Sequence, residues 1–141
     1  ATTTTTTTTT AAPATTTTTT TTTLAPRNGS IAVSSSIAGH LPARATGQWT
    51  FTPTDRRSLT VSVASSDFYS RIKVYDPDAV LRRTSVATGS RGSSVLVLSG
   101  DLCVDGEYTI VVDSRIDYQS GDYTLTVTPG GVLWDSANPS C

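Results

Sequence analysis

Short runs that alternate between apolar and polar residues recur about every ten residues through most of this chain, and a period of two is that of half-buried β-strands. The alternating runs cover residues 48–52, 59–63, 71–75, 108–112 and 123–127, residues 94–98 form a nearly continuous apolar run, and a further short strand begins at 80–81. Turn-forming pairs such as Asp105-Gly106 and Ser120-Gly121 separate them. No segment keeps a helical period for longer than one turn. We therefore expect an all-β domain of seven or eight strands, folded as a β-sandwich or jelly roll.

The boundaries of this domain follow from where the apolar runs begin and end. Every apolar run follows Gly29, so we expect a β-sandwich domain over residues 30–141 and a separate arm and linker over residues 1–29. A domain of this size can bury a core of its own. Val132, Leu133 and Trp134 come after the last expected strand. We expect this tail to fold back on the sandwich.

The arm consists almost entirely of threonine. Nine threonines (Thr2–Thr10) are followed by Ala11-Ala12-Pro13-Ala14, nine more threonines (Thr15–Thr23) and Leu24-Ala25-Pro26, which makes two copies of a threonine-and-proline repeat. A homopolymer presents the same side chain on both faces, so nothing in it sets a strand register or drives burial. We expect the unmodified arm to be disordered.

Threonine tracts interrupted by proline are typical of O-glycosylated stalks. An extended backbone at about 3.1 Å per residue would carry the arm roughly 70 Å. A domain of this size is only about 30 to 40 Å across, so the arm could contact a neighbouring subunit. The expected O-glycosylation sites are Thr2, Thr3, Thr4, Thr5, Thr6, Thr7, Thr8, Thr9, Thr10, Thr15, Thr16, Thr17, Thr18, Thr19, Thr20, Thr21, Thr22 and Thr23.

Two further modifications are suggested by short motifs. Asn28-Gly29-Ser30 is a sequon that makes Asn28 a candidate N-glycosylation site, whereas Pro139 blocks the sequon at Asn138. Cys103 and Cys141 are the only cysteines, too few for a four-ligand zinc site. We predict an intrachain disulfide between them, with a bond to another subunit or free thiols as the alternatives.

Charge and hydropathy restrict the possible partners and the location. Ten basic and eleven acidic residues give a net charge of −1, and Lys73 is the only lysine, so no basic stripe is available for nucleic acid. No apolar run is long enough to span a membrane, and the first residues do not form a signal peptide. We expect a secreted or cell-surface protein that is already processed or is a fragment of a longer precursor.

Several of the expected strands occur in a characteristic order. They are Trp49-Thr50-Phe51, Leu59-Thr60-Val61-Ser62-Val63, Ile72-Lys73-Val74-Tyr75-Asp76, Gly106-Glu107-Tyr108-Thr109-Ile110-Val111-Val112 and Gly121-Asp122-Tyr123-Thr124-Leu125-Thr126-Val127. This order resembles the bacterial pre-peptidase C-terminal domain family over about residues 30–128. The resemblance implies a non-catalytic β-sandwich, usually appended to secreted enzymes or surface proteins. Some members of that family bind matrix polymers or calcium.

The sequence offers little support for catalysis or metal binding. His40, the only histidine, lies in the turn-like stretch 39–42, where we expect a solvated loop residue rather than a catalytic base. Calcium could bind at Asp76 and Asp78, or at the group Asp113, Asp117 and Asp122. No twelve-residue calcium loop is present, and turn aspartates usually bond to their own backbone. We expect no enzyme activity and no cofactor.

Arginine pairs and aromatic residues are the remaining candidates for binding. Arg56-Arg57 and Arg82-Arg83 are expected in turns, where they could bind carboxylates or sugar hydroxyls of a partner or could simply be solvated. Trp134 and the five tyrosines could form a sugar-stacking surface. Roles in the core and on the sheet surface explain Trp49 and the alternating tyrosines better.

These observations lead to two hypotheses of different classes. The first is a structural subunit of an extracellular glycosylated fibre or surface coat, in which the arm contacts neighbouring copies. The alternative is a non-catalytic polysaccharide- or matrix-binding module on a mucin-like stalk. The expected partners are copies of the same chain and covalently attached glycans, with no nucleic acid.

Overall fold

A computed structural model describes residues 25–53, 57–87, 92–98, 102 and 104–133. Within these residues the chain forms nine β-strands and no helix. The strands are β1 (Asn28–Ser30), β2 (Ser35–Leu41), β3 (Gly47–Phe51), β4 (Arg57–Ala64), β5 (Ser70–Tyr75), β6 (Leu81–Val86), β7 (Ser94–Leu98), β8 (Tyr108–Ser114) and β9 (Gly121–Leu133).

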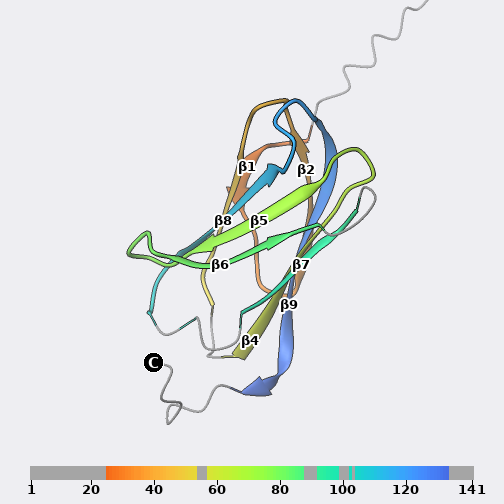
Figure 1. The fold of residues 1–141 in the computed structure, drawn as a ribbon. Helices are drawn as coiled ribbons and strands as arrows, with labels where there is room; N and C mark the ends of the chain where they lie inside the picture. Colours follow the sequence, from red (N-terminus) through yellow and green to blue (C-terminus); the bar gives the residue numbers. More distant parts are fainter. Residues whose placement is uncertain (1–24, 54–56, 88–91, 99–101, 103, 134–141) are drawn as a thin grey trace, which may run out of the picture.

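The strands form two sheets that pack face to face as a β-sandwich (Figure 1). One sheet has the order β1-β3-β8-β5-β6 and the other the order β2-β9-β4-β7. All pairings are antiparallel except that of β1 with β3. The all-β sandwich expected from the sequence is confirmed.

The ends of the domain differ from the sequence prediction. β1 begins at Asn28, before the expected boundary at residue 30, and pairs in parallel with β3. β9 continues through Val132 to Leu133, so the expectation that these residues lie beyond the last strand is wrong. Their backbone stays in the sheet because β9 remains paired with β4 after a register shift, with Leu133 opposite Arg57.

The core lies between the sheets and is made by alternate residues of most strands. Phe68, between β4 and β5, fills it from a loop. The run 94–98 alternates rather than being continuously apolar: Leu96 and Leu98 point inward, whereas Val95 and Val97 are each more than half exposed. The buried hydrophobic cluster comprises Ile31, Leu41, Trp49, Phe51, Leu59, Val61, Val63, Phe68, Ile72, Val74, Leu96, Leu98, Leu102, Tyr108, Ile110, Val112, Tyr123, Leu125 and Val127.

Among the described residues, buried hydrogen bonds join the two sheets in two places, and one of them links the hydroxyls of Ser70 on β5 and Ser94 on β7, 2.8 Å apart. The indole Nε1 of Trp49 on β3 donates to the hydroxyl of Tyr123 on β9, at 2.7 Å. This bond satisfies a donor that burial would otherwise leave without a partner. The ring of Tyr123 also packs edge-to-face against Phe68, with a centroid distance of 6.0 Å. Tyr123 thus fixes the spacing of the sheets near β2.

No helix in the described part of the chain is long and apolar enough to cross a membrane.

Candidate functional site

The outer face of the five-stranded sheet carries charged, amide and hydroxyl side chains. β8 lies between β3 and β5, and the register aligns outward-facing residues across the three strands. Val111 lies between Gln48 and Lys73, and Thr109 lies opposite Tyr75. Residues two positions apart along a strand share a face, so these rows form one continuous surface.

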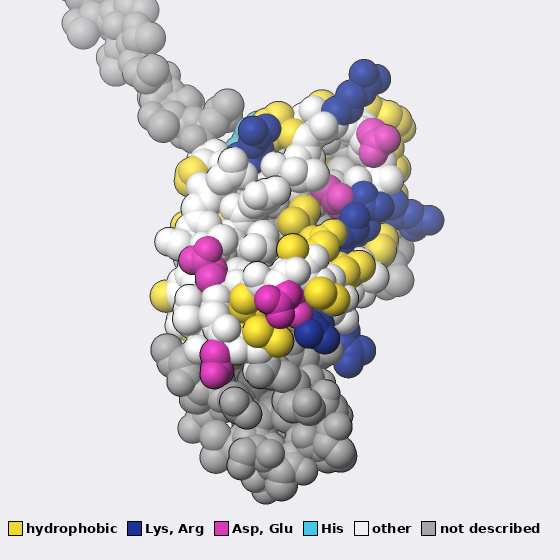
Figure 2. All heavy atoms as spheres, turned by 90° about the vertical axis from the view of Figure 1, so that its left-hand side faces the viewer, with side chains coloured by type: hydrophobic (Ala, Val, Ile, Leu, Met, Phe, Trp, Pro, Cys, Tyr) yellow, Lys and Arg dark blue, Asp and Glu magenta, His cyan; other side chains and the backbone are white. Residues whose placement is uncertain are grey.

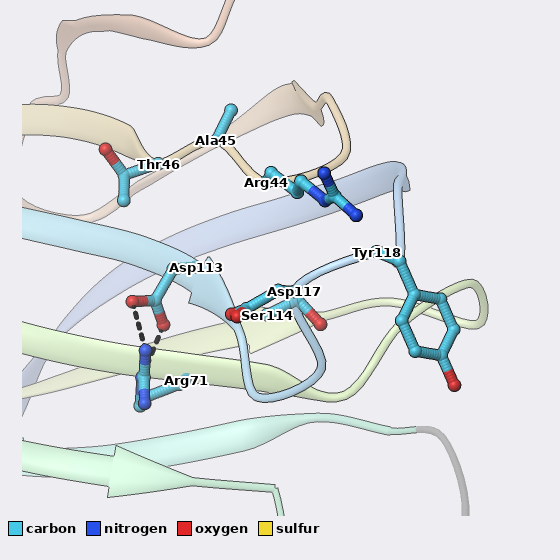
Figure 3. Close-up of a pocket in the computed structure, with 8 residues that line it drawn as sticks. All are labelled: Arg44, Ala45, Thr46, Arg71, Asp113, Ser114, Asp117 and Tyr118. Atoms are coloured by element: carbon cyan, nitrogen blue, oxygen red, sulfur yellow. Dashed lines mark hydrogen bonds and ion pairs between the residues drawn. The ribbon is translucent and has the colours of Figure 1, made fainter.

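One end of this face is hollowed into a cleft of about 620 Å³. The strands β5 and β8 form its base, and the loops β2–β3 and β8–β9 form its walls (Figure 3). The cleft is lined by Arg44, Ala45, Thr46, Arg71, Asp113, Ser114, Asp117 and Tyr118.

An ion pair lies at the base of the cleft. Arg71 donates from Nε and from a terminal nitrogen to the two carboxylate oxygens of Asp113, at 2.6 and 2.7 Å (Figure 3). The hydrogen bond to Asp113 raises the pKa of Arg71, although burial opposes this shift. Because Asp113 is buried and Arg71 stays charged, the pair forms a rigid bidentate unit rather than a loose surface contact.

The two walls of the cleft are joined by a backbone hydrogen bond. The amide of Arg44 donates to the carbonyl oxygen of Asp117, at 2.6 Å. Arg44 has a φ of 59°, in the left-handed region that non-glycine residues seldom adopt. Beyond this contact Tyr118 is 73% exposed, and its ring projects from the loop at the mouth of the cleft (Figure 3).

A second hollow of about 640 Å³ continues from the first along β3, β8 and β5. Both hollows are lined by Thr46 and Asp113, so they form one groove, which we call the outer groove. The residues that line the second hollow are Thr46, Gln48, Lys73, Tyr75, Asp76, Pro77, Ala79, Glu107, Thr109, Val111 and Asp113.

The far end of the outer groove is held by the turn between β5 and β6. One carboxylate oxygen of Asp76 accepts hydrogen bonds from the amides of Asp78 and Val80, each at 2.9 Å, and the other accepts one from Arg82 Nε at 2.7 Å. Burial alone would raise the pKa of Asp76. The two amides and the Arg82 guanidinium outweigh that effect and hold the pKa below its usual value. Asp76 is therefore an ionised residue that organises the turn.

Charges of both signs occur together on this protein. Figure 2 shows acidic and basic side chains interspersed around a band of hydrophobic ones on one face. Within the outer groove Arg71 is balanced by Asp113, and Asp76 is balanced by Arg82. The groove thus presents hydrogen-bonding groups without a strong net field.

The structure corrects the expected position of His40. His40 lies in β2 rather than in a solvated loop, and it is half-buried. It is placed there because β2 pairs with β9, which sets His40 opposite Asp122 and brings His40 Nδ1 to 2.7 Å from the Asp122 carboxylate.

The calcium candidates are divided among different parts of the fold. Asp113 and Asp117 line the same cleft, whereas Asp122 bonds His40 on the other sheet. Both carboxylate oxygens of Asp76 already accept hydrogen bonds, one from the backbone amide of Asp78 and the other from Arg82. The described residues contain no group of three or more histidine, cysteine or acidic residues placed to hold a metal ion.

The arginine pairs lie in strands where described, not in turns as expected. Arg82 and Arg83 are in β6 and Arg57 begins β4. Arg82 is engaged by Asp76. The sequon residue Asn28 is exposed in β1, and its side-chain oxygen accepts a hydrogen bond from the Gln48 amide at 3.0 Å.

Other predicted residues lie outside the described part of the chain. They are the threonines of residues 2–23, the cysteines Cys103 and Cys141, and Arg56, Trp134 and Asn138. The glycosylation, disulfide and tail contacts predicted for them stay predictions.

Sequence reasoning did not find the outer groove. Its central ion pair forms because the register of β5 on β8 sets Arg71 opposite Asp113, residues that are far apart in sequence. The alternation of polar residues predicts which face of each strand points outward. It does not predict which strands lie next to one another in the sheet. Asp76, Asp113 and Asp117 were considered only as calcium ligands, and the tyrosines were named as a possible sugar-stacking surface without being placed in a groove.

No protein-family model matches the sequence, and no curated protein matches it in sequence. Among solved structures, the chain is similar to the pre-peptidase C-terminal domain of a collagenase from Bacillus anthracis. The TM-score is 0.55 and the identity 17%, over 71% of this chain and 93% of that chain. The likeness establishes the fold. It agrees with the resemblance that the order of the strands suggested.

A second similar structure is PliG of Aeromonas hydrophila, a periplasmic inhibitor of g-type lysozyme. Its TM-score is 0.46 and its identity 14%, over 72% of this chain and 97% of that chain.

Proposed function

We propose that this protein is a non-catalytic structural subunit of an extracellular, glycosylated fibre or surface coat. The β-sandwich is the folded unit, and the threonine arm is an O-glycosylated connector that contacts neighbouring copies. The observation that carries the proposal is the arm itself, two tracts of nine threonines joined to a small β-sandwich.

The place where the arm joins the domain supports a connecting role. The arm leads into β1, an edge strand of the five-stranded sheet whose residues are all exposed. A chain that leaves from a sheet edge can extend away from the sandwich without crossing its core. Glycans that stiffen such a segment would lower the entropy lost when it is ordered against a neighbour, a loss of about 1 to 2 kcal/mol per residue for a bare chain.

Exposed apolar side chains on two neighbouring edge strands support contacts between copies. β6 and β7 are edge strands of different sheets, and the hydroxyl of Ser85 on β6 donates to the carbonyl oxygen of Val95 on β7, at 2.8 Å. Large exposed hydrophobic residues gather on these strands and just before β6, and they are Val80, Leu81, Val86, Val95 and Val97. Apolar surface of this kind commonly marks protein interfaces. A patch that docks on a different surface of the next copy produces an open filament.

Native material provides the decisive test. Its intact mass should exceed the 14.7 kDa of the bare chain because of glycans. Enzymatic removal of O-glycans, or deletion of residues 1–23, should shorten or dissolve the fibres seen in electron micrographs while circular dichroism still reports a folded β-domain.

Two results would count against the proposal. A native mass equal to that of the bare chain would remove the glycosylated connector. Fibres of unchanged length after deletion of the arm would show that sandwich surfaces alone hold the assembly. A native protein that forms no polymer would instead favour the second candidate, a saccharide- or matrix-binding module, which the outer groove supports.

A further inference from the structure

We propose that the outer groove binds a neutral saccharide chain. The groove is formed by side chains on the outer face of β3, β8 and β5, between the cleft near Tyr118 and the turn that Asp76 holds. The shape, charge and free hydrogen-bonding groups of the groove each point to this class of ligand.

The shape of the outer groove suits a linear polymer. Its rows of side chains run along the strands from the pair Arg71 and Asp113, through Val111, to Thr109 and Tyr75. Strands rise about 3.3 Å per residue, so successive rows lie about 6.7 Å apart. The three rows together with the loops at both ends accommodate several sugar rings in line. A single small molecule would fill only one of the two hollows.

The charge balance favours a neutral ligand. Basic and acidic groups are mixed along the groove, and both of its buried carboxylates, Asp76 and Asp113, are paired with arginines. A polyanion would meet Asp117 and Glu107 without a matching excess of cations, and a polycation would meet Lys73 and Arg44. Desolvating unmatched charge is costly, so a chain of uncharged hydroxyl groups is the best electrostatic match.

Several groups in the groove are free to bind hydroxyls. The side chains of Gln48, Lys73 and Glu107 form no hydrogen bond or ion pair within the described part of the chain. They supply amide, ammonium and carboxylate groups, so both donors and acceptors are present. The rings of Tyr75 and the exposed Tyr118 add flat apolar surface with a polar tip, which can pack against the carbon-bound hydrogens of a sugar ring.

An unmodified peptide strand fits this site less well. Peptides that extend a sheet bind at an edge, where backbone groups are unpaired. β8 is a central strand, paired with β3 on one side and β5 on the other, so its backbone groups belong to the sheet. The groove therefore offers side chains alone, and these match hydroxyl groups better than a peptide backbone.

The saccharide can come from two sources. If the proposed fibre function holds, the O-glycans on the arm of a second copy are one source of the ligand. Their binding would join the arm of one copy to the sandwich of another. This source rests on that proposed function. A free environmental polysaccharide has the same chemistry and requires no fibre.

The test measures binding of defined saccharides to the full chain. The probes are cellohexaose, mannohexaose and the O-glycans released from native material, with a heparin hexasaccharide as the polyanionic comparison. Isothermal titration calorimetry should detect binding of at least one neutral probe. Tyr75→Ala and Tyr118→Ala should each weaken that binding at least tenfold, because both side chains lie on the groove surface and outside the core cluster.

A matched control separates the groove from the rest of the surface. Thr124→Ala changes an exposed residue on the outer face of the other sheet and should leave binding unchanged. Binding of released O-glycans alone identifies the arm as the source, and binding of the hexasaccharides alone identifies free polysaccharide. The proposal is overturned if no neutral probe binds, if only heparin binds, or if the tyrosine variants bind as tightly as the parent. None of these results depends on whether fibres form, so the fibre proposal stands or falls separately.

Discussion

Gly39 lies where the ring of Tyr123 crosses the inner side of β2. A Cβ atom at Gly39 would overlap the Tyr123 ring, and one at Gly47 would lie 2.7 Å from the Tyr123 hydroxyl. Both glycines are therefore required by the packing of one aromatic side chain. Tyr123 in turn holds the indole of Trp49, and burial raises the pKa of Tyr123 so that its hydroxyl stays protonated.

We predict that Gly39→Ala destabilises the domain by about 1 to 3 kcal/mol, the usual cost of overpacking a core. Urea denaturation gives the free energy of unfolding directly. Ala38→Ser is the matched control, because Ala38 is exposed on the other face of the same strand, and it should change stability by less than about 0.5 kcal/mol. Equal stability of the Gly39→Ala variant and the parent would contradict the packing described for Tyr123.

The second residue-scale prediction concerns Asp76, whose pKa is lowered in the fold. Asp76→Asn should lower the melting temperature at pH 7, because the ionised carboxylate holds the β5–β6 turn and pairs with Arg82. A folded pKa below the unfolded value of about 3.9 means that the stabilisation is complete above that pH. The stabilisation is then lost as the pH falls through the folded value.

Melting curves recorded by circular dichroism from pH 7 to pH 2 test this pH dependence of the stabilisation by Asp76. The gap in melting temperature between the parent and Asp76→Asn should be constant above about pH 5 and narrow below about pH 4. Asp78→Asn is the control on the same turn, since only its backbone amide bonds Asp76. A gap that persists unchanged at pH 2 would show that the charge of Asp76 is not what stabilises the turn.

At the scale of the element, the sequence predicted strands well where inward residues are apolar. β3, β4, β5 and β8 have such patterns and were placed within a few residues. β2 was missed because its inward position 39 is a glycine, whose space Tyr123 fills from β9. Most of β6 was missed because five of its six residues are exposed, so burial imposes no alternation on it. The outer groove could not be predicted, since it depends on which strands become neighbours.

The edge strand β7 carries the third prediction. Val95→Thr combined with Val97→Thr keeps the β-branched shape that strands favour and removes exposed apolar surface. The double variant should keep a melting temperature within a few degrees of the parent, and on the proposed fibre function it should form fibres only at several-fold higher protein concentration. Light scattering recorded as a function of protein concentration gives the concentration at which fibres form.

Thr124→Ser is the control for the β7 variant, because Thr124 is also exposed and lies on a central strand of the same sheet. The Thr124→Ser variant should assemble at the same protein concentration as the parent. Unchanged assembly of the double valine variant would place the contact between copies elsewhere.

At the scale of the whole molecule, the described core begins at Ile31. We predict that a chain starting at Leu24 still unfolds in one cooperative thermal transition and has a β-type circular dichroism spectrum. Its melting temperature should lie within a few degrees of that of the full chain, because none of the core contacts described here involves the arm. A molten or insoluble product would mean that the arm completes the fold.

The position of β9 governs when the chain can fold during its synthesis. β9 is the last strand described, and it lies between β2 and β4 in the sheet. Until residues 121–133 have emerged, β2 has no strand to pair with and one side of the core stays open. Chains emerge from the ribosome N-terminus first, so the earlier strands must wait for the last one. Such a chain can close its sandwich only after residues 121–133 have left the ribosome or a transport channel.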